Sequence, residues 1–101
     1  MTTPGELVDI LLEKTRERKL NWTRLSPNGF NAEIGSNSVT IERQLNNISL
    51  SFENAEGTMI SRVVPSKGRE EIYQELYDLA RRQALRIDET LNDIKNTLEE
   101  L

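Results

Sequence analysis

The spacing of apolar residues changes twice along this chain, and this change constrains the fold more than any other feature of the sequence. From Glu6 to about Lys19 the apolar residues recur at helical spacing, from Trp22 to Val64 they alternate with polar residues, and after Pro65 the helical spacing returns. The chain is 101 residues long, which is the size of one domain. We therefore expect a single α+β domain over residues 1–101, with helices packed on one face of an antiparallel sheet.

The alternating segment from Trp22 to Val64 predicts a three- to four-stranded antiparallel meander. Three segments alternate clearly, at Phe30–Ile34, Val39–Glu42 and Ile48–Glu53. A fourth, Thr58–Val64, has a mixed pattern that leaves its register unassigned and favours an edge position or a bulge. Short separators rich in Gly and Asn, Asn46 among them, predict hairpins between neighbours.

The polar side chains of these strands define the expected solvent face of the sheet. They are small or acidic, whereas a sheet that binds RNA presents aromatic rings on which bases stack. We therefore expect no nucleic-acid platform on this face. Its side chains are Asn31, Glu33, Thr40, Glu42, Ser49, Ser51 and Glu53.

The C-terminal third carries more apolar helix than its own domain can cover. A continuous helix from about Arg69 to Leu101 would be about 50 Å long at ~1.5 Å per residue, whereas a 100-residue domain has a radius of gyration of about 13 Å. From Ala80 onward the apolar residues follow a heptad spacing. The part without an obvious partner in the chain is the stripe formed by Ile87, Leu91, Ile94, Leu98 and Leu101.

Two arrangements would cover this stripe: the helix breaks and its last part folds back, or the stripe packs on another chain. Leu85 lies about 160° from Ile87 around a continuous helix, opposite the stripe. This favours a break at residues 85–88, with Asp88-Glu89-Thr90 supplying a cap and an acidic first turn. We expect one long kinked helix or two short helices, packed on the apolar face of the sheet.

The stripe is also the main functional indication in the sequence. A short chain with few apolar residues and no disulfide gains stability by burying such a stripe in a dimer. We expect a non-catalytic protein–protein interaction module or adaptor, in which residues 88–101 form an oligomerisation or docking helix. The expected partner is a second copy or another helical protein, and the expected interface is Ile87, Leu91, Ile94, Leu98 and Leu101.

Composition argues against catalysis. The chain has no His and no Cys, which removes the usual proton shuttle, the thiolate nucleophile and the commonest transition-metal ligands. A hydrolase or isomerase would need converging carboxylates, but the adjacent pairs Glu70-Glu71, Asp88-Glu89 and Glu99-Glu100 point about 100° apart on a helix. We expect no catalytic residues, no cofactor and no metal.

The alternative function is a regulatory protein that binds nucleic acid or another anion. One group of cations surrounds Trp22 near the end of the first helix, and a second lies in the C-terminal helical region. The simpler interpretation is a cationic helix end with Trp22 in the core, and a solvated face with local ion pairs. The candidate anion-binding residues are Lys14, Arg16, Arg18, Lys19, Arg81, Arg82 and Arg86.

The sequence also indicates a cytoplasmic protein with no membrane partner. No apolar run reaches 18 residues, and the first residues lack the positive charge and apolar stretch of a secretory signal.

Overall fold

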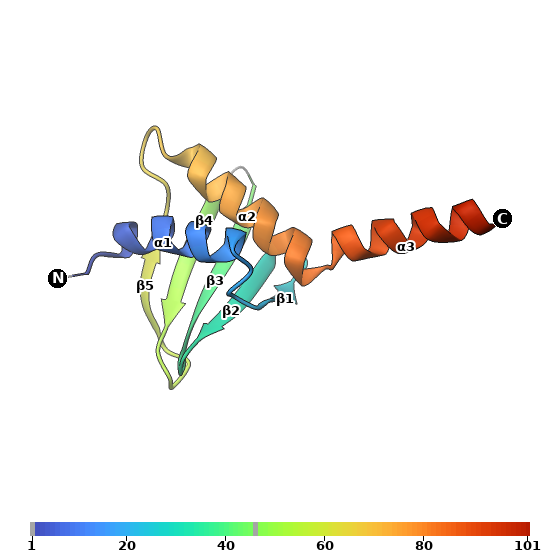
Figure 1. Ribbon diagram of the computed structural model, residues 1–101. Coiled ribbons are helices and arrows are strands. Elements are labelled where there is room, and N and C mark those ends of the chain that lie inside the picture. The colour runs from blue at the N-terminus through green and yellow to red at the C-terminus, as the bar shows by residue number, and fades with distance from the viewer. Residues whose placement is uncertain (1, 46) are drawn as a thin grey trace.

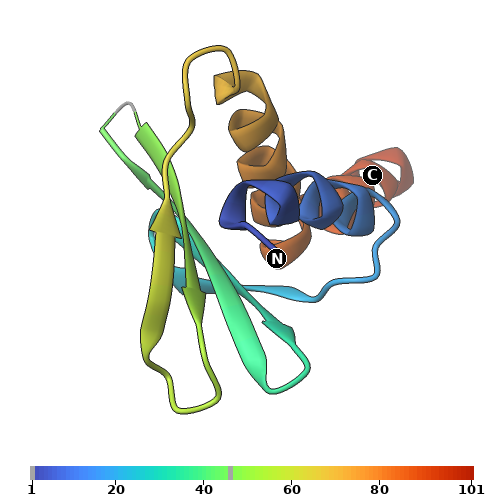
Figure 2. The same ribbon diagram turned by 90° about the vertical axis from the view of Figure 1, so that its left-hand side faces the viewer.

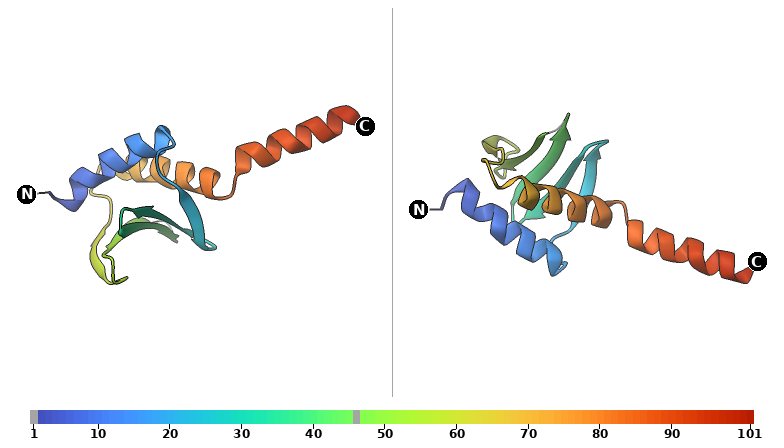
Figure 3. Two further views of the ribbon diagram at one scale, coloured as in Figure 1. Left: turned by 60° about the horizontal axis from the view of Figure 1, so that its bottom comes forward. Right: turned by 90° about the horizontal axis from the view of Figure 1, so that it is seen from above.

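The computed structural model describes residues 2–45 and 47–101. It has two layers, with helices on one face of a five-stranded sheet and a last helix that leaves the domain (Figures 1 and 3). The turn predicted at Asn46 lies outside the described residues. The elements in chain order are α1 (Pro4–Arg16), β1 (Trp22–Ser26), β2 (Gly29–Ile34), β3 (Asn37–Gln44), β4 (Asn47–Glu53), β5 (Met59–Val63), α2 (Glu70–Ala84) and α3 (Ile87–Glu100).

The sheet is an antiparallel meander in the order β1-β2-β3-β4-β5, which confirms the predicted fold class and topology. It has one strand more than the three or four predicted. The additional strand is β1, in which Trp22 is buried and the other four residues are exposed, so no alternation marks it. The predicted edge position of the last strand is confirmed by β5, and its pairing with β4 shifts register between Phe52 and Glu53.

The core lies between the inner face of the sheet and the helices α1 and α2, which cover that face together (Figure 2). Helix α2 contacts β1, β2, β3 and β4, whereas α1 contacts α2 and β5. The rings of Phe30 and Tyr77 meet at the centre, with centroids 5.6 Å apart. The buried apolar residues are Val8, Leu11, Leu12, Trp22, Phe30, Ala32, Val39, Ile41, Ile48, Leu50, Tyr73, Leu76, Tyr77 and Ala80.

Two residues predicted on the solvent face of the sheet, Thr40 and Ser49, are buried. Longer neighbours on the same face cover them. The Thr40 hydroxyl accepts a hydrogen bond from Asn31 at 2.9 Å and donates one to Glu53 at 2.9 Å, and an Arg62 guanidinium lies 3.4 Å from the Ser49 hydroxyl. Small polar residues on a sheet are therefore buried when flanking side chains bridge over them.

Helix α1 ends at Arg16, three residues before the predicted end near Lys19. Arg18 takes a left-handed conformation, with φ of 59°. Its amide donates to the carbonyl of Thr15, and the amide of Lys19 donates to the carbonyl of Lys14. These two bonds form a Schellman motif, which satisfies the last carbonyls and ends the helix.

The predicted break at residues 85–88 is confirmed. Helix α2 ends at Ala84, Arg86 is left-handed with φ of 52°, and α3 begins at Ile87. The predicted cap is wrong: Arg86 occupies the cap position without a side-chain hydrogen bond, and Asp88 lies in the first turn. A negatively charged side chain is favoured there by the helix dipole.

The break does not fold α3 back, and the expectation that both C-terminal helices pack on the sheet is wrong for α3. Among the described residues, α3 contacts α2 and no other element. The molecule is elongated as a result, with extents of 56 × 32 × 25 Å and a radius of gyration of 15.1 Å. The left-handed residue changes the direction of the helix but leaves α3 pointing away from the domain (Figure 1).

Candidate functional site

The predicted apolar stripe is exposed on α3, the helix that extends away from the rest of the domain. Leu91 is 56 % exposed, Ile94 50 %, Leu98 64 % and Leu101 94 %, whereas Ile87 is half-buried beside α2. These five residues recur at steps of four and three, so they lie within about 40° of one line along α3. The structure thus brings all five predicted interface residues together on one open face.

The flanks of the stripe are nearly neutral, although α3 as a whole is acidic. Helix α3 contains five acids and one base, Lys95. Four of the acids point more than about 110° away from the centre of the stripe. The residues nearest to the stripe are Thr90 and Thr97 on one side, and Asp88 and Lys95 on the other. This pattern resembles one strand of a coiled coil, with its like charges kept off the seam.

The junction between α2 and α3 gathers three of the predicted cations. The carboxylate of Asp88 accepts a hydrogen bond from Arg82 at 2.7 Å and lies 4.0 Å from the guanidinium of Arg18. Arg86 is exposed in the same short segment. Arg18, Arg82 and Arg86, which we name the arginine junction, lie beside two acids, Asp88 and Glu89, so this segment has a net charge of +1.

The structure does not bring the other four predicted cations into the arginine junction. Arg16 forms an ion pair with Glu75. Lys14 and Lys19 both pair with Glu17, at 3.8 and 3.1 Å. The hydrogen bond from Lys19, together with the charges of Lys14 and Lys19, holds the pKa of Glu17 below its usual value of 4.5. These contacts agree with the interpretation of a cationic helix end, whose charges are paired with Glu17 and Glu75.

Arg81 lies apart from the arginine junction, in a polar hollow between α2 and the β3–β4 hairpin. The hollow is lined by Asn28, Arg43, Leu45, Tyr77, Asp78 and Arg81. The guanidinium of Arg43 there lies 6.0 Å from the centre of the Tyr77 ring.

Trp22 belongs to the core, as predicted. Its side chain is 2 % exposed, and its indole N–H donates to the hydroxyl of Thr15 at 3.0 Å. A base could not stack on this ring without unfolding the contact between β1 and α1. The cations that surround Trp22 in the sequence therefore lack the aromatic platform that single-stranded nucleic acid uses.

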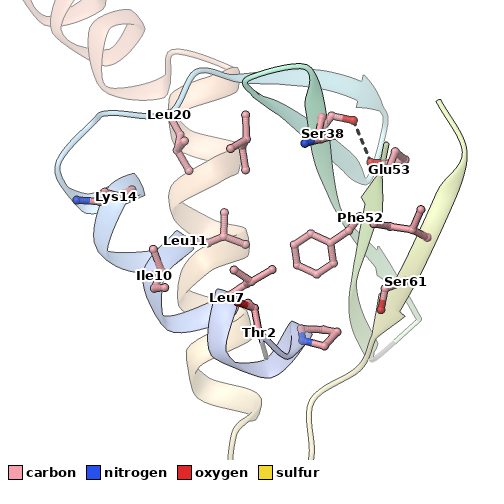
Figure 4. A pocket seen from close by; sticks show the side chains of 14 residues that line it. Thr2, Leu7, Ile10, Leu11, Lys14, Leu20, Ser38, Phe52, Glu53 and Ser61 are labelled. Carbon is pink, nitrogen blue, oxygen red and sulfur yellow. Dashed lines mark hydrogen bonds between the residues drawn. The ribbon is translucent and has the colours of Figure 1, made fainter. Parts of the chain in front are cut away.

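A groove that the sequence does not predict lies between α1 and the sheet (Figure 4). Its volume is about 460 Å³, and most of its lining is apolar. The signal for it was weak, because Ile60 lies in the segment whose register the sequence leaves unassigned, and Ile34, on the expected core face of its strand, is 41 % exposed. The lining residues are Thr2, Pro4, Leu7, Ile10, Leu11, Lys14, Leu20, Ile34, Asn37, Ser38, Phe52, Glu53, Ile60 and Ser61.

One titrating group in the core predicts an effect of pH. Burial raises the pKa of Tyr73 above its usual value of 10.0, Arg69 lowers it in part, and Asp9 raises it. The stability contributed by the neutral phenol is fully present below pH ~10 and is lost as the pH rises through the pKa of the folded state. We expect Tyr73→Phe to flatten the fall in stability between about pH 9 and 12, measured by urea unfolding. An unchanged slope would contradict this assignment.

The described residues include no group of three or more His, Cys, Asp or Glu side chains placed to hold a metal ion. None of the helices in the described part of the chain is both long and apolar enough to cross a membrane. Comparison with protein-family models, with curated proteins and with solved structures finds no match.

Proposed function

We propose that this chain is a non-catalytic protein–protein interaction module that associates with a second copy through α3. The observation that supports the proposal is the apolar stripe of α3, which is exposed on a helix without contact to the sheet. Burying one Leu or Ile side chain contributes about 1.5–3 kcal/mol relative to leaving it in water. A surface that covers the four exposed members of the stripe therefore gains several kcal/mol before the costs of association.

The length of α3 supports the same proposal. Helices shorter than ~12–15 residues are marginal in water when nothing packs on them. Helix α3 has 14 residues, and among the described helices and strands it contacts only α2. A further contact is the ion pair of Asp88 with Arg18. A helix of this length with an apolar stripe gains stability when a partner covers the stripe.

Anion binding is the weaker proposal. Arg16, Lys14 and Lys19 have acidic partners within 4.0 Å, and Trp22 is buried. A small excess of positive charge remains at the arginine junction and in the hollow where Arg43 and Arg81 lie beside Asp78. A cation-rich segment of this size is typical of an interface rim as well as of a phosphate site.

The test of self-association is a pair of polar substitutions in the stripe. We expect the wild type to show a mass that rises from monomer to dimer over about 10 µM to 1 mM in sedimentation equilibrium, the range expected for a short interface. Leu91→Gln with Ile94→Gln should leave a monomer throughout, because glutamine keeps the helix propensity and removes the apolar contact.

The matched control is Asn92→Gln with Asn96→Gln, which places the same two side chains on the opposite face of α3. This control should associate like the wild type. A wild type that stays monomeric over the whole range would refute self-association, and association that survives in the Leu91→Gln and Ile94→Gln variant would exclude the stripe as the interface.

A further inference from the structure

Charge is distributed unevenly along the segment that carries the stripe. The arginine junction, with Arg18, Arg82 and Arg86, lies where α3 begins. Glu99 and Glu100 lie at the far end, where they are exposed. Glu99 is 3.9 Å from Lys95, and Glu100 has no ion-pair partner among the described residues. Each copy therefore has a small excess of positive charge where α3 begins, after Asp88 and Glu89 are counted, and an excess of negative charge where α3 ends.

This polarity distinguishes two ways of pairing α3 with α3 of a second copy. A parallel pair would place the two arginine junctions side by side and the two acidic ends side by side, so like charges would meet at both ends. An antiparallel pair would place each acidic end beside the arginine junction of the other copy. Like charges across an interface oppose association, and complementary charges favour it.

We propose that two copies pair their α3 helices antiparallel, with Glu99 and Glu100 of each copy at the arginine junction of the other. This inference rests on the proposed self-association and specifies its geometry. The partner is a second copy of this chain, and the complementary surface is the stripe together with the charged groups at its two ends.

The spacing of the stripe fixes the register of this pair. In antiparallel coiled coils a residue at heptad position a of one helix packs against a residue at position d of the other. On α3, position a is occupied by Leu91 and Leu98, and position d by Ile87, Ile94 and Leu101. Leu91 then packs against Ile94 of the second copy, and Ile87 packs against Leu98 of the second copy. The two-fold axis passes between residues 92 and 93. Leu101 reaches the level of residue 84, next to Leu85, which is 36 % exposed.

The residues beside the stripe agree with this register. Thr90 lies opposite Thr97 of the second copy, so that two hydroxyl groups meet on one flank. Asp88 lies within about one helical turn of Lys95 of the second copy on the other flank. Glu99 of the second copy lies as near to Asp88 along the axis as Lys95 does, so the three arginines of the junction have to outweigh this one pair of like charges.

The neighbouring registers are less favourable for identifiable reasons. A shift by one heptad toward the C-terminus would remove Ile87 from the seam and bring Glu99 level with Asp93 of the second copy. A shift in the other direction would drive the end of α3 past the junction into the α2 helix of the second copy. The antiparallel register centred between residues 92 and 93 is the one that uses the whole stripe and both charged ends.

The test is charge reversal at each end, singly and together. Arg86→Glu alone, and Glu99→Arg with Glu100→Arg alone, should each weaken the dimer about tenfold in Kd at low salt, since the contact occurs twice in a symmetric dimer. The triple variant should associate within about threefold of the wild type, because its charges are again complementary. Arg81→Glu is the matched control, since it makes the same charge change away from the junction and should leave Kd unchanged.

The results distinguish the proposed self-association from the proposed antiparallel geometry. A wild type that does not self-associate refutes the proposed function itself. Self-association that neither single reversal weakens overturns only the antiparallel geometry, since a parallel pair already contains like charges at both ends. If neither charge reversal weakens self-association but Ile60→Gln abolishes it, α3 binds in the groove between α1 and the sheet of the second copy. This result would overturn the pairing of α3 with α3.

Discussion

Replacing Phe30 by alanine is expected to lower the free energy of unfolding by about 3–5 kcal/mol, the usual cost of deleting a large buried aromatic side chain. Phe30 is 1 % exposed, on the inner face of β2. Its ring packs on Tyr77 of α2, so the substitution opens a cavity between the two layers. Because the free energy of unfolding of such domains is about 5–15 kcal/mol, this substitution would remove a large part of the stability.

Urea unfolding followed by circular dichroism measures this loss. The matched control is Phe52→Ala, which removes the same atoms from a half-buried position beside the groove and leaves less of a cavity. We expect the control to cost clearly less than Phe30→Ala. A cost for Phe52→Ala equal to that for Phe30→Ala would show that the core is not centred on the contact between Phe30 and Tyr77.

Both positions come from strands that the sequence predicts well. Alternation identifies β2, β3 and β4, because each has one face turned to the core and one turned to water. It fails for β1, where only Trp22 is buried, and for β5, where Ser61 occupies an inward position paired with Phe52. Edge strands have fewer buried neighbours, so their sequences carry less of the pattern.

The end of α2 could be predicted from one residue. Leu85 opposite the stripe indicated that the helix could not continue unchanged, and the left-handed Arg86 confirms the break. The direction of α3 after the break could not be predicted. It depends on the dihedral angles of a single residue and on the contacts of Asp88 with Arg82 and Arg18, and none of these leaves a periodic signal in the sequence.

The candidate site, like the fold, could be predicted from the sequence only in part. The stripe was predictable, since helical spacing alone places its residues on one face. Which cations form ion pairs could not be predicted, because the partner of Arg16 is Glu75, 59 residues away. The arginine junction needed the Schellman turn after α1, which brings Arg18 to the start of α3. Contacts between distant residues decide which charges remain free to act at a surface.

A second substitution tests how the helices are held together. Thr15 is fully buried, and its hydroxyl accepts the indole N–H of Trp22 at 3.0 Å. Its carbonyl accepts a hydrogen bond from the side chain of Gln83 at 2.8 Å. Thr15 therefore connects α1 both to β1 and to the last turn of α2, from which α3 extends.

Replacing Thr15 by valine preserves the shape of the side chain and removes its oxygen, which leaves the indole N–H buried without a partner. We expect the free energy of unfolding to fall by about 1–3 kcal/mol. Thr15→Ser keeps the oxygen and should cost about 0.5–1.5 kcal/mol, the range for one methyl group. Urea unfolding of both variants measures the difference.

A double-mutant cycle shows whether the hydrogen bond itself is responsible. In a Trp22→Phe background no indole N–H is left unsatisfied, so Thr15→Val should then be nearly neutral. An equal cost for Thr15→Val in both backgrounds would assign the loss to packing instead. Because the bond from Gln83 uses the Thr15 carbonyl, which every one of these variants retains, the end of α2 should stay in place and self-association through α3 should be unchanged while the domain is folded.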